Sequence, residues 1–215
     1  MAEDLNLDEL EKKAWKSTYQ DGLWDIFFGL IFIGMGIYQI PQFYGLDDTF
    51  TLIMILMSWN FSLVLLFIIG KKFVTIPRMG FVKYGKKRVV KRVKLAIFLG
   101  FMVLVNVIFL FLPYIGLEIS LNAFTTMFII GTLFITFPLC VMAYFLQFER
   151  LYIIAIIGGL GLSIGELLRP IVGSPLHHII IFSVIGGIIT TWGALIFIRF
   201  LRKYPLPKDD QNREV

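Results

Sequence analysis

The stretch that decides the fold is residues 179–200, IIIFSVIGGIITTWGALIFIRF, in which Arg199 is the one charged residue. A helix needs about 20 apolar residues to cross the hydrocarbon core of a bilayer, and this stretch is long enough. Five more apolar runs precede it, at residues 23–40, 51–70, 95–112, 123–146 and 151–168. The sequence therefore predicts an all-α membrane protein with six transmembrane helices.

The composition argues against a water-soluble globule. Of the 215 residues, 58% are hydrophobic and 16% are charged, whereas soluble domains usually carry about a quarter charged residues. Polar surface is too scarce to cover several long apolar runs. The single cysteine, Cys140, lies inside one of these runs, so no disulfide can form within the chain.

The six runs form one transmembrane domain, residues 23–203, between two polar segments. Residues 1–22 mix charged residues with apolar ones at helical spacing, and predict an amphipathic interfacial helix. Two interpretations of this helix fit: it lies on the membrane face, or it packs on the protein as a soluble helix. Residues 204–215 form a polar C-terminal tail.

The basic residues predict the orientation, because Lys and Arg are enriched in short cytoplasmic loops. With the N-terminus inside, three of them precede the first run, ten lie between the second and third, one is Arg150, and five lie from Arg199 onward. Only Arg169 then falls on the outer side. We therefore expect a multi-pass protein of the cell membrane with both termini in the cytoplasm.

The longest connection, residues 71–94, is expected to carry a small cytoplasmic β-hairpin. Two β-rich tetrads, residues 73–76 and 81–84, flank the sequence PRMG at residues 77–80. Proline presets φ at the start of such a turn and glycine tolerates the conformation that closes it. The pattern therefore predicts a hairpin between the second and third transmembrane helices.

A strongly basic stretch, residues 86–94, follows the expected hairpin. Its simplest role is to anchor the third helix at the inner face, but its charge also favours an anionic leaflet or a cytoplasmic partner. Nucleic-acid binding has no recognised fold to support it. The residues expected to contact lipid or a partner are Arg78, Lys86, Lys87, Arg88, Lys91, Arg92 and Lys94.

Residues 75–84, TIPRMGFVKY, resemble a Pro-Arg-x-Gly-(Tyr/Phe)-Val motif of small, uncharacterised prokaryotic membrane proteins. Residues 21–26, DGLWDI, at the entry to the first helix, are also similar to theirs. The resemblance implies a multi-helix membrane protein. It implies no established activity and no catalytic residues.

Polar side chains inside the apolar runs are the first candidate functional residues, since an unpaired ionised group is costly in a bilayer. Asp25 lies near the start of the first run, where its simplest partner is a basic residue of the inner face. Asn60 and Asn106 lie at matching depths in the second and third runs. They predict hydrogen bonds between helices or the lining of a polar path.

A second set of candidates lies at the outer end of the last two runs. Glu166 and Arg169 are three residues apart, so they share a helix face and can pair, and His177 and His178 begin the next helix at the same end. These four predict a polar vestibule, an anion site or a pH-sensitive gate, or else an interfacial ion pair beside two exposed histidines. Adjacent histidines and one glutamate lack a dedicated metal-binding spacing, so no metal is expected.

Glycines crowd the fifth and sixth runs. Small residues let two helix backbones approach closely, either within one chain or in a homo-oligomer. The sequence therefore predicts tight packing of these two helices. The glycines concerned are Gly158, Gly159, Gly161, Gly165, Gly186, Gly187 and Gly193.

No Walker loop, HExxH, GxSxG or CxxC motif occurs in the chain. An enzyme is therefore disfavoured and no cofactor is expected. Two functions stay open. One is a small transporter or channel for a polar or ionic solute, lined by the intramembrane asparagines and the outer cluster. The other is a non-catalytic scaffold, sensor or accessory subunit that binds anionic lipid or a cytoplasmic partner through its basic hairpin.

Overall fold

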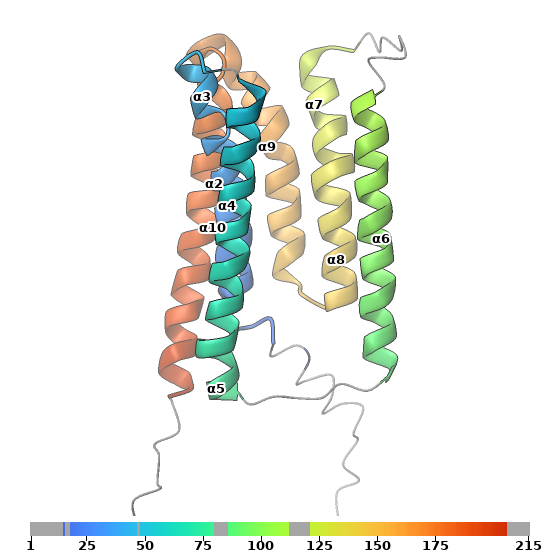
Figure 1. The fold of residues 1–215 in the computed structure, drawn as a ribbon, viewed down its shortest axis with the longest axis vertical. Helices are drawn as coiled ribbons and strands as arrows, with labels where there is room; N and C mark the ends of the chain where they lie inside the picture. Colours follow the sequence, from blue (N-terminus) through green and yellow to red (C-terminus); the bar gives the residue numbers. More distant parts are fainter. Residues whose placement is uncertain (1–14, 16–17, 47, 80–85, 112–120, 206–215) are drawn as a thin grey trace, which may run out of the picture.

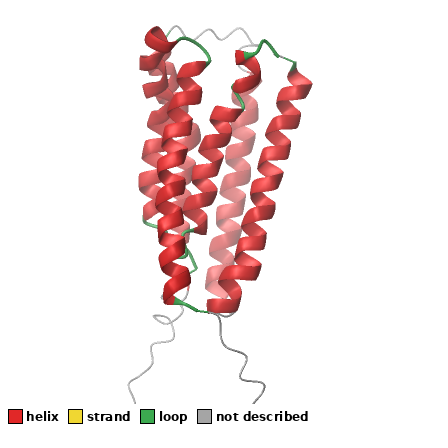
Figure 2. Cartoon of the chain, turned by 90° about the vertical axis from the view of Figure 1, so that its left-hand side faces the viewer, coloured by secondary structure: helices red, strands yellow, loops and turns green. Residues whose placement is uncertain are grey.

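The computed structural model describes residues 15, 18–46, 48–79, 86–111 and 121–205. Within these ranges every regular element is a helix, and the long helices stand side by side in one bundle (Figures 1 and 2). Five helices of the described part are long and apolar enough to cross a membrane. They are Leu23–Phe43, Phe50–Met79, Ala123–Leu146, Arg150–Val172 and Leu176–Lys203.

The chain runs up and down the bundle in sequence order. The first two passes are α2 (Leu23–Ile37) with α3 (Ile40–Phe43), then α4 (Thr49–Ile69), continued by the π-helix η1 (Gly70–Thr75) and α5 (Ile76–Met79). Next come α6 (Lys86–Phe111) and a rod made of α7 (Ala123–Gly131), the π-helix η3 (Thr132–Thr136) and α8 (Phe137–Leu146). The last two passes are α9 (Arg150–Val172) and α10 (Leu176–Lys203).

The two ends of the bundle differ in charge. We call the end that carries Lys71, Arg150 and the last turn of α10 the basic end. The opposite end carries His177 and His178, and we call it the histidine end. In Figure 1 the basic end, marked by α5, is at the bottom, and the histidine end, marked by α3, is at the top.

The closest packing in the bundle joins α2 to α10, which run antiparallel. Gly22, just before α2, faces Gly193 of α10, and Gly29, within α2, faces Gly186 of α10. The two contacts are seven residues apart on each helix. A Cβ added at Gly29 or Gly186 would lie under 3.0 Å from backbone atoms of the partner helix. The predicted close approach is thus confirmed within the chain for Gly186 and Gly193, whereas Gly187 faces open space.

Helix α9 lies in the middle of the bundle and packs on α10 at one side and on α7, η3 and α8 at the other. Its glycines contact neighbouring helices on both sides. A Cβ at Gly158 would meet the ring of Phe32 in α2, and one at Gly159 would meet Thr136 and Gly131 of the α7–η3 rod. The predicted packing role of the α9 glycines is therefore met by neighbours inside the chain.

The predicted β-hairpin is wrong in its first half. Residues 73–76 are helical, at the end of η1 and the start of α5. The apolar helix α4 simply continues past Gly70, and the weak β propensity of Phe73 and Val74 does not stop it. Residues 80–85, the rest of the predicted hairpin, lie outside the described residues.

Two prolines account for the two π-helical segments. Pro77 and Pro138 each follow a π-helix by two residues, since η1 ends at Thr75 and η3 at Thr136. Proline lacks an N–H, and its ring collides with the carbonyl four residues earlier. A wider π turn relieves that collision and re-routes the backbone bonds. Pro138 therefore sits beside a distorted turn of the rod formed by α7, η3 and α8.

The sixth transmembrane helix stays a prediction. The third apolar run falls in α6, but six of the first nine residues of this helix are basic. Helix α6 is not among the five apolar spans of the described part of the chain. Residues 112–120, which follow it, lie outside the described ranges.

Of the predicted amphipathic N-terminal segment, Trp15 and residues 18–22 are described. Trp15 is buried, and its indole N–H donates to the carbonyl oxygen of Leu146 at 2.9 Å. The guanidinium of Arg92 lies over its ring at 4.8 Å. This part of the segment packs on the bundle, and the amphipathic helix itself stays a prediction.

Candidate functional site

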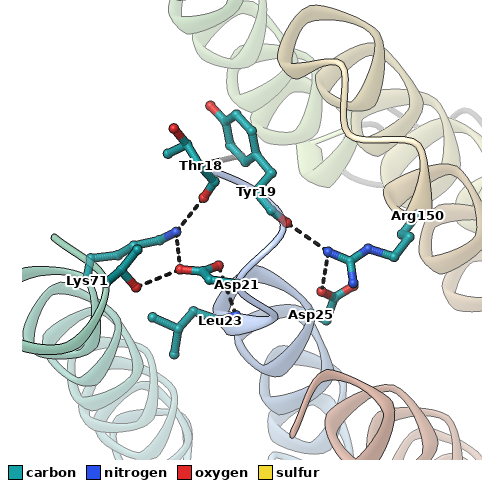
Figure 3. Close-up of polar contacts among 8 residues, drawn as sticks. Thr18, Tyr19, Asp21, Leu23, Asp25, Lys71 and Arg150 are labelled. Atoms are coloured by element: carbon teal, nitrogen blue, oxygen red, sulfur yellow. Dashed lines mark hydrogen bonds and ion pairs between the residues drawn. The ribbon is translucent and has the colours of Figure 1, made fainter. Parts of the chain in front are cut away.

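An ion-pair cluster ties the start of α2 to its neighbours at the basic end (Figure 3). Asp21, which is fully buried, accepts hydrogen bonds through Oδ2 from Lys71 Nζ at 2.6 Å and from Thr75 Oγ1 at 2.7 Å. Lys71 also donates to the carbonyl oxygen of Thr18 at 2.7 Å, and Asp21 Oδ1 accepts from the backbone N–H of Leu23 at 3.2 Å. One carboxylate therefore joins α2 to η1.

A second carboxylate joins α2 to α9. Asp25 is buried, and its Oδ2 lies 3.2 Å from Nη2 of Arg150, the first residue of α9. The same nitrogen donates to the carbonyl oxygen of Tyr19 at 2.8 Å. The sequence expected a basic residue of the inner face as the partner of Asp25, and Arg150 fits that expectation. Asp21 and Asp25 are thus each paired with a cation.

Aromatic side chains form a layer directly next to these ion pairs. The ring of Trp24 lies 4.6 Å from that of Phe67 in α4 and 5.9 Å from that of Phe28. Phe27 also contacts Phe67, at 5.0 Å between ring centroids. Partly buried aromatic rings and paired charges thus lie together at the basic end of α2, α4 and α9.

The fold brings the four outer candidates together at the histidine end. Arg169 Nη1 lies 3.3 Å from Glu166 Oε2, and His177 Nε2 lies 3.7 Å from Glu166 Oε1. The rings of His177 and His178 are 4.0 Å apart. His177 is 2% exposed and His178 is half-buried, so the two histidines are not exposed as one interpretation had them.

A cavity of about 460 Å³ lies beside this cluster. Aliphatic and aromatic side chains from α2, α4, α7, α9 and α10 make up most of its wall, and few of its groups are polar. His178 of the outer cluster is one of them. The lining residues are Ile31, Gly34, Met35, Tyr38, Gln39, Leu56, Trp59, Asn60, Met127, Leu162, His178 and Phe182.

The floor of the cavity toward the basic end is aromatic. Phe182 stacks on His178 at 6.0 Å between centroids, and on Phe32 of α2 at 6.3 Å with an angle of 1° between the rings. At the α4 wall, the indole N–H of Trp59 donates to the carbonyl oxygen of Leu30 at 3.2 Å. The stacked rings of His178, Phe182 and Phe32 thus run from the wall of the cavity to α2.

The two intramembrane asparagines have different outcomes. Asn60 lines the cavity, and its amide donates to the carbonyl oxygen of Leu56 in its own helix at 2.8 Å. The predicted bond between helices is therefore wrong for Asn60, because this face of α4 borders an open space and not a neighbouring helix. The side chain of Asn106 lies outside the described part of the structure.

The predicted lipid or partner contacts are only partly available to a ligand. Arg78 Nη1 donates to the carbonyl oxygen of Val74 at 3.0 Å, and Arg92 lies over Trp15. Lys91 and Lys94 are exposed and line a groove of about 590 Å³ near the basic end, with Tyr144 and Tyr152 opposite. The side chains of Lys86, Lys87 and Arg88 are outside the described residues.

Five long apolar helices with paired charges at one end define an all-α, multi-pass membrane protein. No protein-family model, curated protein or solved structure matches the chain. The resemblance of residues 75–84 to prokaryotic membrane proteins therefore names no family here. The function has to be argued from the residues themselves.

Sequence reasoning missed most of the residues that shape these sites. Asp21 and Lys71 were placed in polar segments outside the membrane domain or at its edge, although each lies within a few residues of an apolar run. The available signal was that charged residues lie at the ends of three apolar runs. Helix ends that lie at the same depth can bring opposite charges into contact. Tyr38, Gln39 and Trp59 gave no such signal, because their meeting depends on how the helices pack.

Proposed function

We propose that this protein is a small transporter for an uncharged amphipathic solute, with a cavity that opens at the histidine end and is closed at the basic end. The observation that carries the proposal is the cavity of about 460 Å³ between α2, α4, α7, α9 and α10. A polar or ionic solute was expected from the sequence. The apolar wall favours a more amphipathic molecule.

The chemistry of the lining supports this class of solute. Small-molecule sites are typically concave and apolar, with a few polar groups that orient the ligand. Asn60, Gln39 and Tyr38 offer amide and hydroxyl groups, while Met35 and Phe182 offer apolar surface. Among the described residues, no Asp, Glu, Lys or Arg lines this cavity. A neutral solute with one polar group matches that set best.

Closure at the other end supports transport over simple binding. Many transporters hold a midplane site with one side open and the other sealed, and exchange the two by moving helices as units. Here the seal is the Phe32–Phe182 stack, the Trp24–Phe67 contact and the Asp25–Arg150 ion pair. Ion pairs between separate helices can break and re-form, so they suit an inner gate.

We infer the orientation from the charge distribution. If α6 is the sixth span and the N-terminus is cytoplasmic, the basic end faces the cytoplasm, in accord with the excess of Lys and Arg there. The cavity then opens toward the outer side of the cell membrane.

Cysteine accessibility tests the cavity. In a Cys140→Ser background, Asn60→Cys should react with a membrane-impermeant methanethiosulfonate from the outer side, because a thiol ionises only where water reaches it. Phe61→Cys is the matched control: it is the next residue of α4, it is exposed, and it does not line the cavity. We expect reaction at residue 60 to be about tenfold faster. Equal rates would remove the cavity from the mechanism.

The gate is tested from the cytoplasmic side with the same cysteine. The double change Asp25→Asn with Arg150→Gln removes both charges and leaves neither unpaired. Inside-out vesicles should then show labelling of Asn60→Cys that is absent without the double change. Glu166→Gln with Arg169→Gln is the control pair, because it lies at the other end. Labelling that never appears from the cytoplasmic side would contradict an inner gate.

Flux is measured by the swelling of proteoliposomes in isosmotic glycerol, acetamide or propane-1,2-diol. We expect swelling faster than in protein-free liposomes, and slower again when Asn60→Leu closes part of the polar lining. Rates equal to those of protein-free liposomes for all three solutes would contradict transport of this class.

A second function is favoured by the groove at the basic end. Lys91 and Lys94 line this groove of about 590 Å³ with Tyr144, Tyr152 and one carboxylate, Glu149, so its lining carries a net positive charge suited to an anionic lipid headgroup. Each lysine is worth about 1 kcal/mol near an anionic surface. Native mass spectrometry should therefore show several-fold less phosphatidylglycerol retained by Lys91→Ala with Lys94→Ala. Arg202→Ala, at the same end but outside the groove, is the control, and an equal loss there would contradict a defined site.

A further inference from the structure

We propose that Glu166, His177 and His178 bind a divalent transition-metal ion of the zinc type at the histidine end. One donor atom from each residue lies within 4.8 Å of the other two. Two imidazoles and one carboxylate form a donor set that zinc sites use. The same set also suits Co²⁺, Ni²⁺ and Cu²⁺.

His177 is prepared as a ligand by its own backbone contact. Its Nδ1 lies 3.1 Å from the carbonyl oxygen of Gly173, which can only accept, so Nδ1 carries the proton. The lone pair of the neutral ring is then on Nε2. That atom is buried, makes no hydrogen bond, and lies 3.7 Å from Glu166 Oε1. Metal-binding histidines commonly show this arrangement, with one ring nitrogen held by a carbonyl and the other aimed at the ion.

Glu166 supplies the negative charge. Its side chain is 6% exposed, and Oε1 points toward His177 while Oε2 contacts Arg169 at 3.3 Å. Arg169 is 54% exposed on its side chain, so it can keep this contact or leave it. In either case one carboxylate oxygen stays available on the histidine side. Arg169 therefore orients the ligand and does not occupy the metal position.

His178 completes the set and links it to the cavity. Its Nε2 is buried without a hydrogen-bond partner, and its ring faces Gly165, where a Cβ would lie 3.3 Å from Cδ2. Donor atoms in a tetrahedral zinc site are about 3.3 Å apart, so the ring must turn slightly to close the site. The space beside it allows this, because His178 lines the cavity of about 460 Å³.

Three protein ligands leave one coordination position, and the adjoining cavity is where that position can be reached. Zinc sites with three protein ligands hold water or a ligand atom in the fourth place. A solute with a carbonyl or hydroxyl oxygen could therefore bind the ion from the cavity. The metal site itself does not rest on the proposed transport, because it is formed by side chains that need no solute.

The charge balance predicts moderate affinity. One carboxylate faces a divalent ion, while Arg169 and the start of α10 add positive potential nearby. We therefore expect a micromolar rather than a nanomolar site. The chain contains two histidines and one cysteine in all, so few other side chains can mimic this signal.

The test is metal binding to the full chain, purified without a polyhistidine tag. Co²⁺ titration should give visible d–d absorption of a nitrogen- and oxygen-ligated ion, and dialysis against Zn²⁺ should leave about one ion per chain. His177→Ala and Glu166→Gln should each weaken binding at least about tenfold. Cys140→Ser should bind as the unchanged protein does.

Arg169→Gln separates a metal site from an ion pair. Removing this cation should leave Zn²⁺ affinity unchanged or raise it, because the carboxylate is no longer shared. A network that merely stabilises the helix ends would give no metal signal in any of these proteins. Circular dichroism and gel filtration show whether His177→Ala folds. If it does not, His178→Phe, which keeps a ring stacked on Phe182, is the variant to test. Binding that His177→Ala or His178→Phe leaves unchanged, in a folded protein, would overturn the proposal.

Discussion

The two ends of this bundle differ in what lies next to their buried polar groups. At the basic end, Asp21 and Asp25 are buried and each meets a cation from another helix. At the histidine end, His177 and His178 hold imidazole nitrogens without hydrogen-bond partners, next to a cavity. The carboxylate oxygens of Asp25 also lack hydrogen-bond partners, but they lie beside the guanidinium of Arg150. Paired charges hold helices together, whereas ring nitrogens with a lone pair beside a space are suited to a ligand. The difference separates an ion-paired end from a candidate binding site.

Packing follows the same division. At the basic end, the backbones of α2 and α10 touch at Gly193, where a Cβ would lie 2.7 Å from the backbone nitrogen of Ile26. At the histidine end, a Cβ at Gly36 would lie 3.2 Å from Ile179 and Ser183 atoms. The two helices therefore approach closely at both ends, and the approach is closer at the basic end than at the histidine end.

The largest expected effect breaks the buried pair at the basic end. Asp21→Asn leaves Lys71 with an uncompensated charge that is mostly buried, and should lower the free energy of unfolding by about 3–5 kcal/mol. Adding Lys71→Met should recover much of this loss, because no charge is then stranded. Equilibrium unfolding in bicelles measures both.

Glu166→Gln is the matched change at the other end. Its partner Arg169 is largely exposed, so the loss of free energy should stay below about 1 kcal/mol in the absence of added metal. Equal losses at Asp21 and Glu166 would erase the contrast between the two ends.

The glycine contacts give the next effect. Gly193→Ala puts a methyl group against backbone atoms that cannot turn aside, and should cost about 1–3 kcal/mol. Gly36→Ala requires a shift of only a few tenths of an ångström and gains helix propensity of up to about 1 kcal/mol, so its loss should be smaller than that of Gly193→Ala. Thermal unfolding of both variants measures at which end α2 and α10 are packed more tightly. A Gly36→Ala loss as large as that of Gly193→Ala would show that α2 and α10 are packed equally tightly along their length.

The sequence predicted the helices well because membrane-spanning helices are set by local hydropathy and length. The rod of residues 123–146 begins and ends where the apolar run does. The same locality explains the failure at residues 73–76, since nothing in the tetrad itself reveals that a long helix continues through it. Whether α6 crosses the membrane is likewise not decided by its local charge alone.

The candidate sites depended on packing, and the sequence predicted them only in part. Glu166, Arg169 and the histidines are near one another along the chain, so a single turn between helices brings them together. Asp21 and Lys71 are 50 residues apart, and their contact needs the register of α2 against η1. The sequence predicted no metal because Glu166 and the two histidines do not form a metal-binding motif along one stretch of chain. The packing of α9 against α10 brings them together from two helices.

Two tryptophans provide a smaller, matched test. Trp15, at the basic end, is buried and donates to Leu146 O at 2.9 Å, and Trp59, at the cavity, is partly buried and donates to Leu30 O at 3.2 Å. Replacing Trp15 by Phe strands the carbonyl of Leu146 at the end of α8, whereas the carbonyl of Leu30 lies inside α2 and keeps its intrahelical hydrogen bond. We expect a loss of about 1–3 kcal/mol for Trp15→Phe and about 1 kcal/mol or less for Trp59→Phe. Unfolding monitored by circular dichroism measures which replacement lowers the free energy of unfolding more. A larger loss for Trp59→Phe would place the rigid part of the bundle at the cavity.

The smallest effect concerns Asp48, which caps α4 at the histidine end, outside the apolar spans. Its carboxylate accepts hydrogen bonds from the backbone N–H and the hydroxyl of Thr51, each at 3.0 Å, and these hold its pKa below the ordinary value of 3.8. A lowered pKa means that the cap stabilises the helix above that ordinary value and is lost as the pH falls through the lower, folded-state pKa. Asp48→Ala should therefore be slightly less stable at neutral pH and should converge with the unchanged protein in acid. Because Asp48 is fully exposed, a large difference at neutral pH would show that the α3–α4 connection closes the cavity and does more than cap a helix.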